Sequence, residues 1–227
     1  MTNKVNFDDY TENYNQLLNE GTRFFSANEE YFARYKIDLI RKQIYTPIKT
    51  ILEYGCGIGR NIPFLQQAFP AAIISGSDIA SASLEVARHD NPGIDFFLEE
   101  ENGEQADVYD MIFVAGVFHH IPVVQRAEVA KNLFNRLSPN GQLFIFEHNP
   151  YNPVTRRIVN NCPYDEDAVL LKPAELKQIL SGAGLIIERK EYCLFVPPSL
   201  SFLTRLESTL GWLPLGGQYW VQASRPI

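Results

Sequence analysis

A short loop after an apolar stretch carries the residues of this chain that are best suited to bind a ligand. Residues 51–54 lead into glycines at positions 55, 57 and 59, and a helix-like segment follows. Glycine lacks a Cβ atom, so the loop can turn tightly and its backbone can lie against a ligand. The N–H groups that open the next helix would face the same ligand. Asp78 ends the next apolar stretch and could bind ribose hydroxyl groups, so the pattern predicts a nucleoside-cofactor site.

The spacing of the glycines argues against two common phosphate-binding loops. The dinucleotide fingerprint needs its third glycine three residues after the second, whereas Gly59 follows Gly57 by two. The P-loop needs a Gly-Lys pair that this loop lacks. Glu53 precedes the glycines and would repel a phosphate. An acid at this position suits a cofactor that carries a positive charge and an amino group.

Three histidines follow stretches that are expected to be strands. His119 and His120 follow one apolar stretch, and His148 follows another. An imidazole near the reacting group could take the proton of a hydroxyl acceptor. We therefore predict His148, His119 and His120 as candidate catalytic bases, with His148 as the first choice, and a structural role as the alternative. His89 is expected to be structural or surface-exposed and not catalytic.

These residues can only act together if the surrounding elements bring them to one edge of the fold. From residue 50 the chain alternates between apolar stretches and helix-like segments. Strands are predicted at 50–55, 72–77, 94–99, 109–115, 142–147, 185–196 and 218–224, and helices at 60–69, 81–89, 122–137 and from 173 to 182 or 184. A turn is predicted at 138–141. The alternation predicts an α/β fold with a doubly wound, Rossmann-like parallel sheet, in which ligands bind beyond the carboxyl ends of the strands.

Further helices are predicted outside this core. Residues 7–18 and 28–44 place apolar side chains at helical spacing, and Ser26 with Glu29 could form a capping box for the second helix. They predict an N-terminal helical cap, in which Tyr14 either packs internally or closes over the cofactor.

Two segments after the fifth strand have open interpretations. Residues 151–157 are polar and interrupted by proline, which predicts a connecting loop or a substrate-binding loop; Arg156 and Arg157 in it are either solvated or bind an anionic substrate group. The apolar stretch 194–215 includes an amphipathic segment at 199–210. It predicts packing on the sheet edge or, alternatively, a substrate channel, a peripheral membrane contact or a homodimer face.

Composition limits the class of protein. The 227 residues suffice for one domain, divided here into a cap (1–48), a cofactor-binding core (49–149) and a substrate-side part with the C-terminal strands (150–227). The net charge of −7 argues against a nucleic-acid partner. Three cysteines without a CxxC pair suggest neither disulfides nor a metal site. We find no signal peptide and no stretch long enough to span a membrane, so a cytoplasmic location is expected.

Four segments resemble motifs of one enzyme family. Residues 53–59, Glu-Tyr-Gly-Cys-Gly-Ile-Gly, together with Asp78, resemble the first motif and the ribose-binding acid of class I S-adenosylmethionine-dependent methyltransferases. Residues 109–121 resemble the fourth-strand motif of the small-molecule branch that includes ubiquinone and menaquinone methyltransferases. Residues 137–143 resemble the turn into its fifth strand, and residues 7–14 resemble its cap helix.

The resemblance implies a seven-stranded sheet whose last strand, 218–224, runs antiparallel, and S-adenosyl-L-methionine as the cofactor. The glycine loop would pack against the methionine part, and Glu100 would meet the adenine amine, with Glu99 and Glu101 as alternatives. The predicted cofactor-binding residues are Glu53, Gly55, Cys56, Gly57, Gly59, Asp78, Ile79, Glu100, Gly116 and Tyr14.

The predicted function is transfer of a methyl group to a small or lipid-linked acceptor, with oxygen as the expected target atom. Two alternatives stay open: a non-catalytic homologue that keeps the cofactor, and an RNA methyltransferase. Residues 116–119 replace the Asn/Asp-Pro-Pro-aromatic tetrad of enzymes that methylate nucleic-acid bases at nitrogen, which argues against the last. The sequence does not identify the acceptor.

Overall fold

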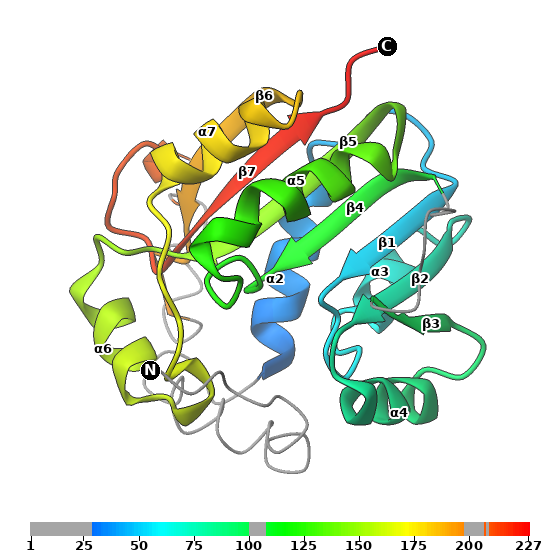
Figure 1. Cartoon of the computed structure of the whole chain (residues 1–227), viewed down its shortest axis with the longest axis horizontal. Helices are drawn as coiled ribbons and strands as arrows, with labels where there is room; N and C mark the ends of the chain where they lie inside the picture. Colours follow the sequence, from blue (N-terminus) through cyan, green and yellow to red (C-terminus); the bar gives the residue numbers. More distant parts are fainter. Residues whose placement is uncertain (1–28, 100–107, 198–206, 208) are drawn as a thin grey trace.

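The computed structural model describes residues 29–99, 108–197, 207 and 209–227 (Figure 1). In these residues helices and strands alternate, as the sequence predicts. The elements are α2 (Glu29–Arg41), β1 (Thr50–Tyr54), α3 (Ile62–Ala68), β2 (Ile73–Asp78), α4 (Ser81–Asp90), β3 (Asp95–Leu98), β4 (Tyr109–Ala115), η2 (Val123–Gln125), α5 (Arg126–Asn135), β5 (Leu137–His148), α6 (Pro153–Asn161), η3 (Pro163–Asp165), α7 (Pro173–Gly182), β6 (Ile186–Cys193) and β7 (Gln218–Ser224).

The strands form a seven-stranded sheet in the order β3-β2-β1-β4-β5-β7-β6. Strands β1 to β5 pair in parallel, and β7 lies antiparallel between β5 and β6. The predicted seven-stranded α/β sheet with an antiparallel last strand is therefore confirmed. Because the five parallel strands end on the same side, the glycine loop, Asp78 and the histidines come to one edge.

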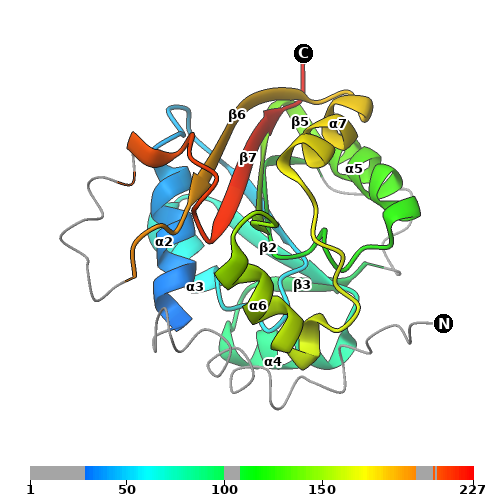
Figure 2. The ribbon, with the colours of Figure 1, turned by 90° about the vertical axis from the view of Figure 1, so that its left-hand side faces the viewer.

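Helices cover both faces of the sheet, and the alternation of side chains along each strand creates two cores. On β4, Met111 and Phe113 pack with α2, α3 and α4, whereas Ile112 and Val114 pack with α5 and α7. Figure 1 shows α5 and α7 in front of the sheet with α2 behind it, and Figure 2 shows the same layers after a quarter turn. The resulting three-layer sandwich holds the carboxyl ends of the strands in fixed positions.

The segment after β5 differs from the sequence-based expectation of an irregular loop. Residues Pro153–Asn161 form helix α6, with the side chain of Asn152 accepting hydrogen bonds from the N–H groups of Val154 (2.9 Å) and Thr155 (3.1 Å). An asparagine cap followed by proline at the first helical position is a helix-start signal. Pro153 is predicted from the sequence to interrupt this segment, whereas in the structure it is the first residue of helix α6.

The predicted turn at residues 138–141 lies inside β5 instead of before it. The register with β4 shifts between the pairs Tyr109–Leu137 and Met111–Gln142, so the intervening residues form a bulge. Asn140 has a positive φ of 63°, which fits the turn chemistry that the sequence suggested. The predicted helix at 122–137 is also shorter, because residues 123–125 form the 3-10 segment η2.

Some predictions fall outside the described residues. The cap helix at 7–18 with Tyr14, the capping box of Ser26, Glu100, and most of the segment 199–210 belong to this group. The cap, homodimer, membrane-contact and lipid-linked-acceptor expectations therefore stay predictions, as does the cytoplasmic location. Within the described part of the chain, no helix combines the length and apolarity needed to cross a bilayer.

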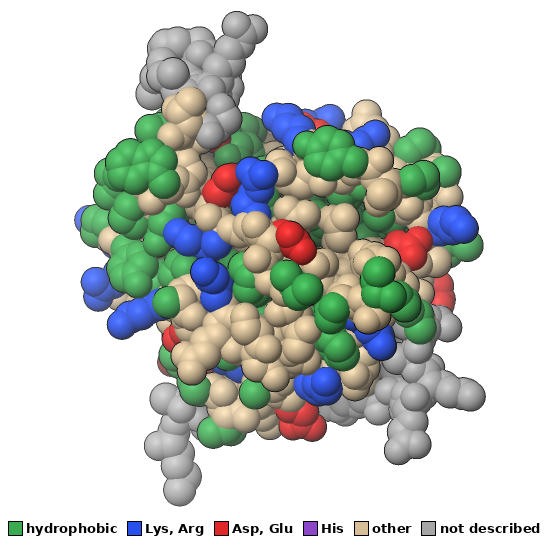
Figure 3. Space-filling model, turned by 90° about the horizontal axis from the view of Figure 1, so that it is seen from above, with side chains coloured by type: hydrophobic (Ala, Val, Ile, Leu, Met, Phe, Trp, Pro, Cys, Tyr) green, Lys and Arg blue, Asp and Glu red, His purple; other side chains and the backbone are tan. Residues whose placement is uncertain are grey.

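Figure 3 shows the face that lies on top in Figure 1, away from the arrowheads of β1 and β4. Acidic, basic and hydrophobic side chains are interspersed on this face. The predicted site residues instead belong to the opposite edge, where the parallel strands end.

Candidate active site

The glycine loop has a backbone that only glycine adopts readily. Gly55, Gly57 and Gly59 have φ values of 69°, 53° and 75°. A Cβ atom on Gly55 would lie 2.4 Å from a methyl group of Val117, whereas one on Gly57 would have no atom within 4 Å. The loop therefore packs tightly against the end of β4 while the backbone at Gly57 stays accessible to a ligand.

Asp78, at the end of β2, fixes the shape of this loop. Its Oδ2 accepts a hydrogen bond from the N–H of Gly57 (2.7 Å), and its Oδ1 accepts one from the N–H of Ala80 (2.9 Å). Burial raises the pKa of the carboxyl group, and the backbone donors counteract part of this shift. A carboxylate oxygen has two lone pairs, so each can accept a further hydrogen bond from a hydroxyl group.

Glu53 is buried in the centre of the site and has an oxygen with no partner. The side-chain amide of Asn61 donates to its Oε1 (2.5 Å), but Oε2 has no hydrogen-bond partner among the described residues. Burial raises the pKa of Glu53 to about 8, although the nearby Lys36 and Arg60 favour its charged form. An unpartnered buried carboxylate oxygen is costly, so this position suits a ligand that brings a positively charged donor.

Lys36 of α2 is a site residue that the sequence did not suggest. It is partly buried, and burial lowers the pKa of its ammonium group to about 8. Helix α2 was predicted as a cap, but nothing in its local pattern shows which polar residue faces the glycine loop. Asn61 was also missed, although its place directly after the loop is a usable signal.

The other predicted cofactor-binding residues differ in which of their atoms a ligand could contact. Ile79 is exposed beside Asp78, and Gly116 has a φ of 73° at the end of β4. The Cys56 side chain instead lies in the core, close to Gly76, so it can offer a ligand only its backbone. Glu99 is the alternative to Glu100 for contacting adenine. Both of its carboxylate oxygens accept hydrogen bonds from the guanidinium group of Arg136 (2.9 and 3.1 Å).

Glu147 anchors the histidines at the ends of β4 and β5. It is fully buried, and its Oε1 accepts from the N–H groups of Val117 (3.1 Å) and Phe118 (2.8 Å). Its Oε2 lies 2.6 Å from Nδ1 of His119. Burial opposes ionisation of Glu147, but the adjacent imidazole and the backbone donors lower its pKa overall.

The structure brings Asp165 of η3 to two of the three predicted histidines, His119 and His120. Its Oδ1 lies 3.6 Å from Nε2 of His119 and 3.3 Å from Nε2 of His120. Burial alone would lower the pKa of His119, but Glu147 and Asp165 raise it to about 9. His119 thus has both nitrogens beside carboxylates, which argues against a role as a free base. No local signal in the sequence marks Asp165.

His148 follows Glu147 at the end of β5, where strand alternation predicts that the two side chains point to opposite faces. Its ring centroid is 4.9 Å from that of His119. Burial and the charge of His119 lower the pKa of His148 to about 4. His148 is therefore neutral at pH 7 but only a weak proton acceptor. His89 is exposed beside Asp90, as expected.

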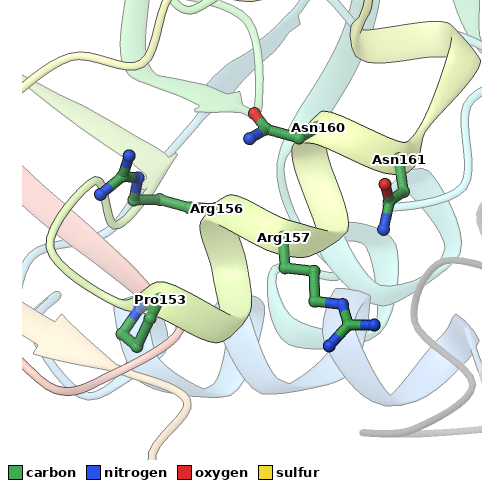
Figure 4. Close-up of a pocket in the computed structure, with 5 residues that line it drawn as sticks. All are labelled: Pro153, Arg156, Arg157, Asn160 and Asn161. Carbon is green, nitrogen blue, oxygen red and sulfur yellow. The ribbon is translucent and has the colours of Figure 1, made fainter.

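A hollow of about 400 Å³ lies along α6, next to this edge of the sheet. Figure 4 shows Arg156 and Asn160 on one side of the helix and Arg157 and Asn161 on the other, as their spacing of four residues requires. Pro153 also lines the hollow. All four polar side chains are exposed, so each side of the helix offers one cationic and one amide donor to a ligand.

Comparisons with known proteins agree with this architecture. A family model described as a methyltransferase domain matches residues 10–189. Trans-aconitate 2-methyltransferase of Escherichia coli (strain ATCC 8739) is 28% identical over 122 residues, which cover 53% of this chain and 46% of that protein. Malonyl-[acyl-carrier protein] O-methyltransferase of Anoxybacillus flavithermus is 32% identical over 107 residues, covering 46% of this chain and 40% of that protein. The match thus spans less than half the length of either relative.

A solved structure shares the fold over nearly the whole chain. The SAM-dependent methyltransferase from Archaeoglobus fulgidus superposes with a TM-score of 0.70 at 14% identity, covering 93% of this chain and 99% of the other. At this low identity the likeness concerns the fold alone.

Proposed function

The chain belongs to the methyltransferase domain family, and from this premise we propose that it transfers the methyl group of S-adenosylmethionine to a carboxylate oxygen of a small acidic molecule. The observation that carries the proposal is the buried Glu53, whose Oε2 has no hydrogen-bond partner in the part of the chain that the structure describes, in the same loop region as the accessible backbone of Gly57. A cationic amino-acid group supplies the missing donor.

The residues at the sheet edge fit this cofactor. Glu53 would hold the amino group of its methionine part, and the two oxygens of Asp78 would bind the ribose hydroxyls. Ile79, exposed next to Asp78, would cover one face of the adenine ring. When bound, the cofactor supplies an electrophilic methyl group on sulfur; the protein aligns the acceptor and excludes water.

The acceptor proposal rests on two further arguments. The names of both curated relatives refer to substrates that carry carboxyl groups, trans-aconitate and a malonyl thioester. A carboxylate is already ionised at neutral pH, so its methylation requires no base. Positioning by cationic side chains is then sufficient, and Arg156 and Arg157 of α6 offer planar guanidinium groups that match a carboxylate.

The test is a methyl-transfer assay with labelled S-adenosylmethionine on a matched panel. The panel pairs dicarboxylic acids, tricarboxylic acids and malonyl thioesters with the corresponding amides, together with phenols and amines. We expect labelled, base-labile methyl esters from the acids alone. Arg156→Gln with Arg157→Gln should raise KM at least tenfold, while Arg189→Gln on the exposed edge strand β6 should leave KM unchanged.

Two results would contradict the proposal. Methylation of phenols or amines without methylation of any acid would remove the carboxylate acceptor. Failure of S-adenosylhomocysteine to bind at millimolar concentration, measured by calorimetry on folded protein, would remove the methyltransferase activity itself.

A further inference from the structure

Three side chains at the ends of β4 and η3 form a cluster that methyl transfer does not require. The Nε2 atoms of His119 and His120 both face Oδ1 of Asp165, at 3.6 and 3.3 Å. The three donor atoms lie within 4.8 Å of one another. Two imidazoles and one carboxylate are a donor set used by zinc and other divalent transition-metal ions.

The second nitrogen of each imidazole also lies beside a carboxylate. Nδ1 of His119 lies 2.6 Å from Oε2 of Glu147, and Nδ1 of His120 lies 3.4 Å from Oδ1 of Asp167. Metal-binding histidines usually donate this second N–H to a carboxylate, which fixes the tautomer and directs the other nitrogen to the ion. Both histidines of the cluster therefore have the outer partner that a ligand needs.

The backbone holds the carboxylate segment at this position. The N–H of Val169 donates to the carbonyl of His119 (2.8 Å), and the N–H of Ala168 donates to the carbonyl of Asp165 (3.0 Å). Arg126, which is buried, donates to the carbonyl of Val169 (2.6 Å) and to that of Ile121 (3.0 Å). The cluster is thus preorganised by bonds that do not involve its own donor atoms.

The spacing of the donors suits a tetrahedral ion. Ligands about 2.0–2.1 Å from a zinc ion lie roughly 3.3–3.4 Å apart along the edges of a tetrahedron. The two histidine-to-Asp165 distances, 3.3 and 3.6 Å, bracket this value closely. All three donor atoms lie within 4.8 Å of one another, so the two imidazoles need only close on Asp165 to surround one ion.

We propose that His119, His120 and Asp165 bind a Zn²⁺ ion through Nε2, Nε2 and Oδ1, with Glu147 and Asp167 orienting the two imidazoles. Three protein ligands leave a fourth position open for water or for an oxygen atom of the acceptor. The use of that position by an acceptor carboxylate rests on the proposed function, whereas metal binding itself does not. The sequence alone predicts no metal site in this chain.

The position of the cluster favours contact with the acceptor. Cε1 of His119 lies 3.7 Å from the point where a Cβ atom of Gly116 would stand, so the cluster adjoins the loop that closes the cofactor site. The ring of His148 is also close, with its centroid 4.9 Å from that of His119.

The experiment measures the binding of Zn²⁺ to the protein in the absence of cofactor and acceptor. Full-length protein is stripped with a chelator, dialysed and titrated with ZnCl₂ by calorimetry, with the bound metal counted by mass spectrometry. We expect one ion per chain with a dissociation constant below about 1 μM. Asp165→Asn and His120→Gln should each weaken binding at least 100-fold, and Asp167→Asn should weaken it 10- to 100-fold as an orienting residue.

The control is His89→Gln, which removes an exposed histidine far from the cluster in sequence and should bind Zn²⁺ like the wild type. Circular dichroism checks that each variant is folded. A crystal soaked in ZnCl₂ should show an anomalous peak 2.0–2.2 Å from the three donor atoms, which tests the site without any variant.

Binding weaker than 10 μM by the wild type, or a crystal without a peak at the cluster, would overturn the proposal, and the three residues would then form an ion-pair network only. The proposal would also be overturned if a folded Asp165→Asn variant bound Zn²⁺ as tightly as the wild type. S-adenosylhomocysteine binding is measured in parallel on the stripped protein. If the protein binds Zn²⁺ but not S-adenosylhomocysteine, the proposed function is wrong and the metal site stands. If it binds S-adenosylhomocysteine but not Zn²⁺, the metal site is wrong and the proposed function stands.

Discussion

Burial of the Glu53 side chain controls the ionisation of its carboxyl group, and therefore how this residue can bind a cationic ligand. Lys36, Arg60, Asp78 and Asn61 face its carboxyl group, yet burial dominates and raises its pKa to about 8. Much of the carboxyl group is therefore protonated at pH 7 in the free protein. A bound ammonium group would favour the ionised form, so binding should release a proton.

We therefore expect the affinity for S-adenosylhomocysteine to increase from pH 6 to pH 8, by at most tenfold per pH unit, because the ionised fraction of Glu53 grows over this range. Glu53→Gln keeps the size of the side chain but cannot ionise. This variant should lose the pH dependence and bind about tenfold more weakly at pH 8, since it loses a charge-assisted hydrogen bond. Calorimetry in buffers with different ionisation enthalpies measures both the affinity and the proton release. Parallel pH profiles for wild type and variant would contradict the role of Glu53.

At the scale of the element, α6 depends on a single asparagine. The Asn152 side chain accepts hydrogen bonds from two N–H groups of the first helical turn and donates to the carbonyl of Leu215 (2.7 Å). Asn149 adds a second connection, donating to the carbonyl of Gly216 (2.7 Å). The helix that carries Arg156 and Arg157 is thus tied at its first turn to the segment before β7.

Replacing the cap should release this helix in part. Asn152→Ala should lower the free energy of unfolding by about 1–2 kcal/mol, measured by urea denaturation, because it removes the cap and the bond to Leu215. Asn152→Asp keeps the cap acceptor but loses the donor, so it should cost less than the alanine variant. Asn160→Ala, at an exposed position of the same helix, should change the stability by no more than about 0.5 kcal/mol. An equal loss at positions 152 and 160 would show that the cap has no special role.

At the scale of the whole molecule, Glu207 connects segments from both ends of the described chain. Its Oε2 accepts from the hydroxyl of Tyr35 on α2 (2.6 Å), and its Oε1 accepts from the N–H groups of Phe195 (2.8 Å) and Val196 (2.7 Å) after β6. Glu207 is buried, so these three donors are satisfied by one side chain away from solvent. The carboxylate fastens α2 to the C-terminal side of the sheet.

Glu207→Ala should therefore lower the free energy of unfolding by about 2–4 kcal/mol, because it leaves buried donors without partners. Thermal and urea unfolding measure the loss. Glu85→Ala, at an exposed position of α4, is the matched control and should change stability by less than about 0.5 kcal/mol. A Glu207 variant as stable as the control would mean that water replaces the carboxylate at this junction.

Elements with a local pattern could be predicted from the amino-acid sequence. Strands β4 (Tyr109–Ala115) and β7 (Gln218–Ser224) have the predicted bounds, since buried strands read as short apolar stretches between turn residues. The glycine loop was equally visible, because a backbone with positive φ restricts the residue type itself. The resemblance to a family added the number of strands and the antiparallel direction of the last one, which periodicity cannot supply, whereas the order of the strands came from the structure.

Which polar residues contact one another depends on how distant segments of the chain fold together. Lys36 approaches Glu53 from a separate helix, and Asp165 reaches His119 and His120 from beyond α6. Such contacts follow from how distant segments pack, and no local pattern records them. The ionisation of Glu53 depends in the same way on burial, which exists only once both faces of the sheet are covered.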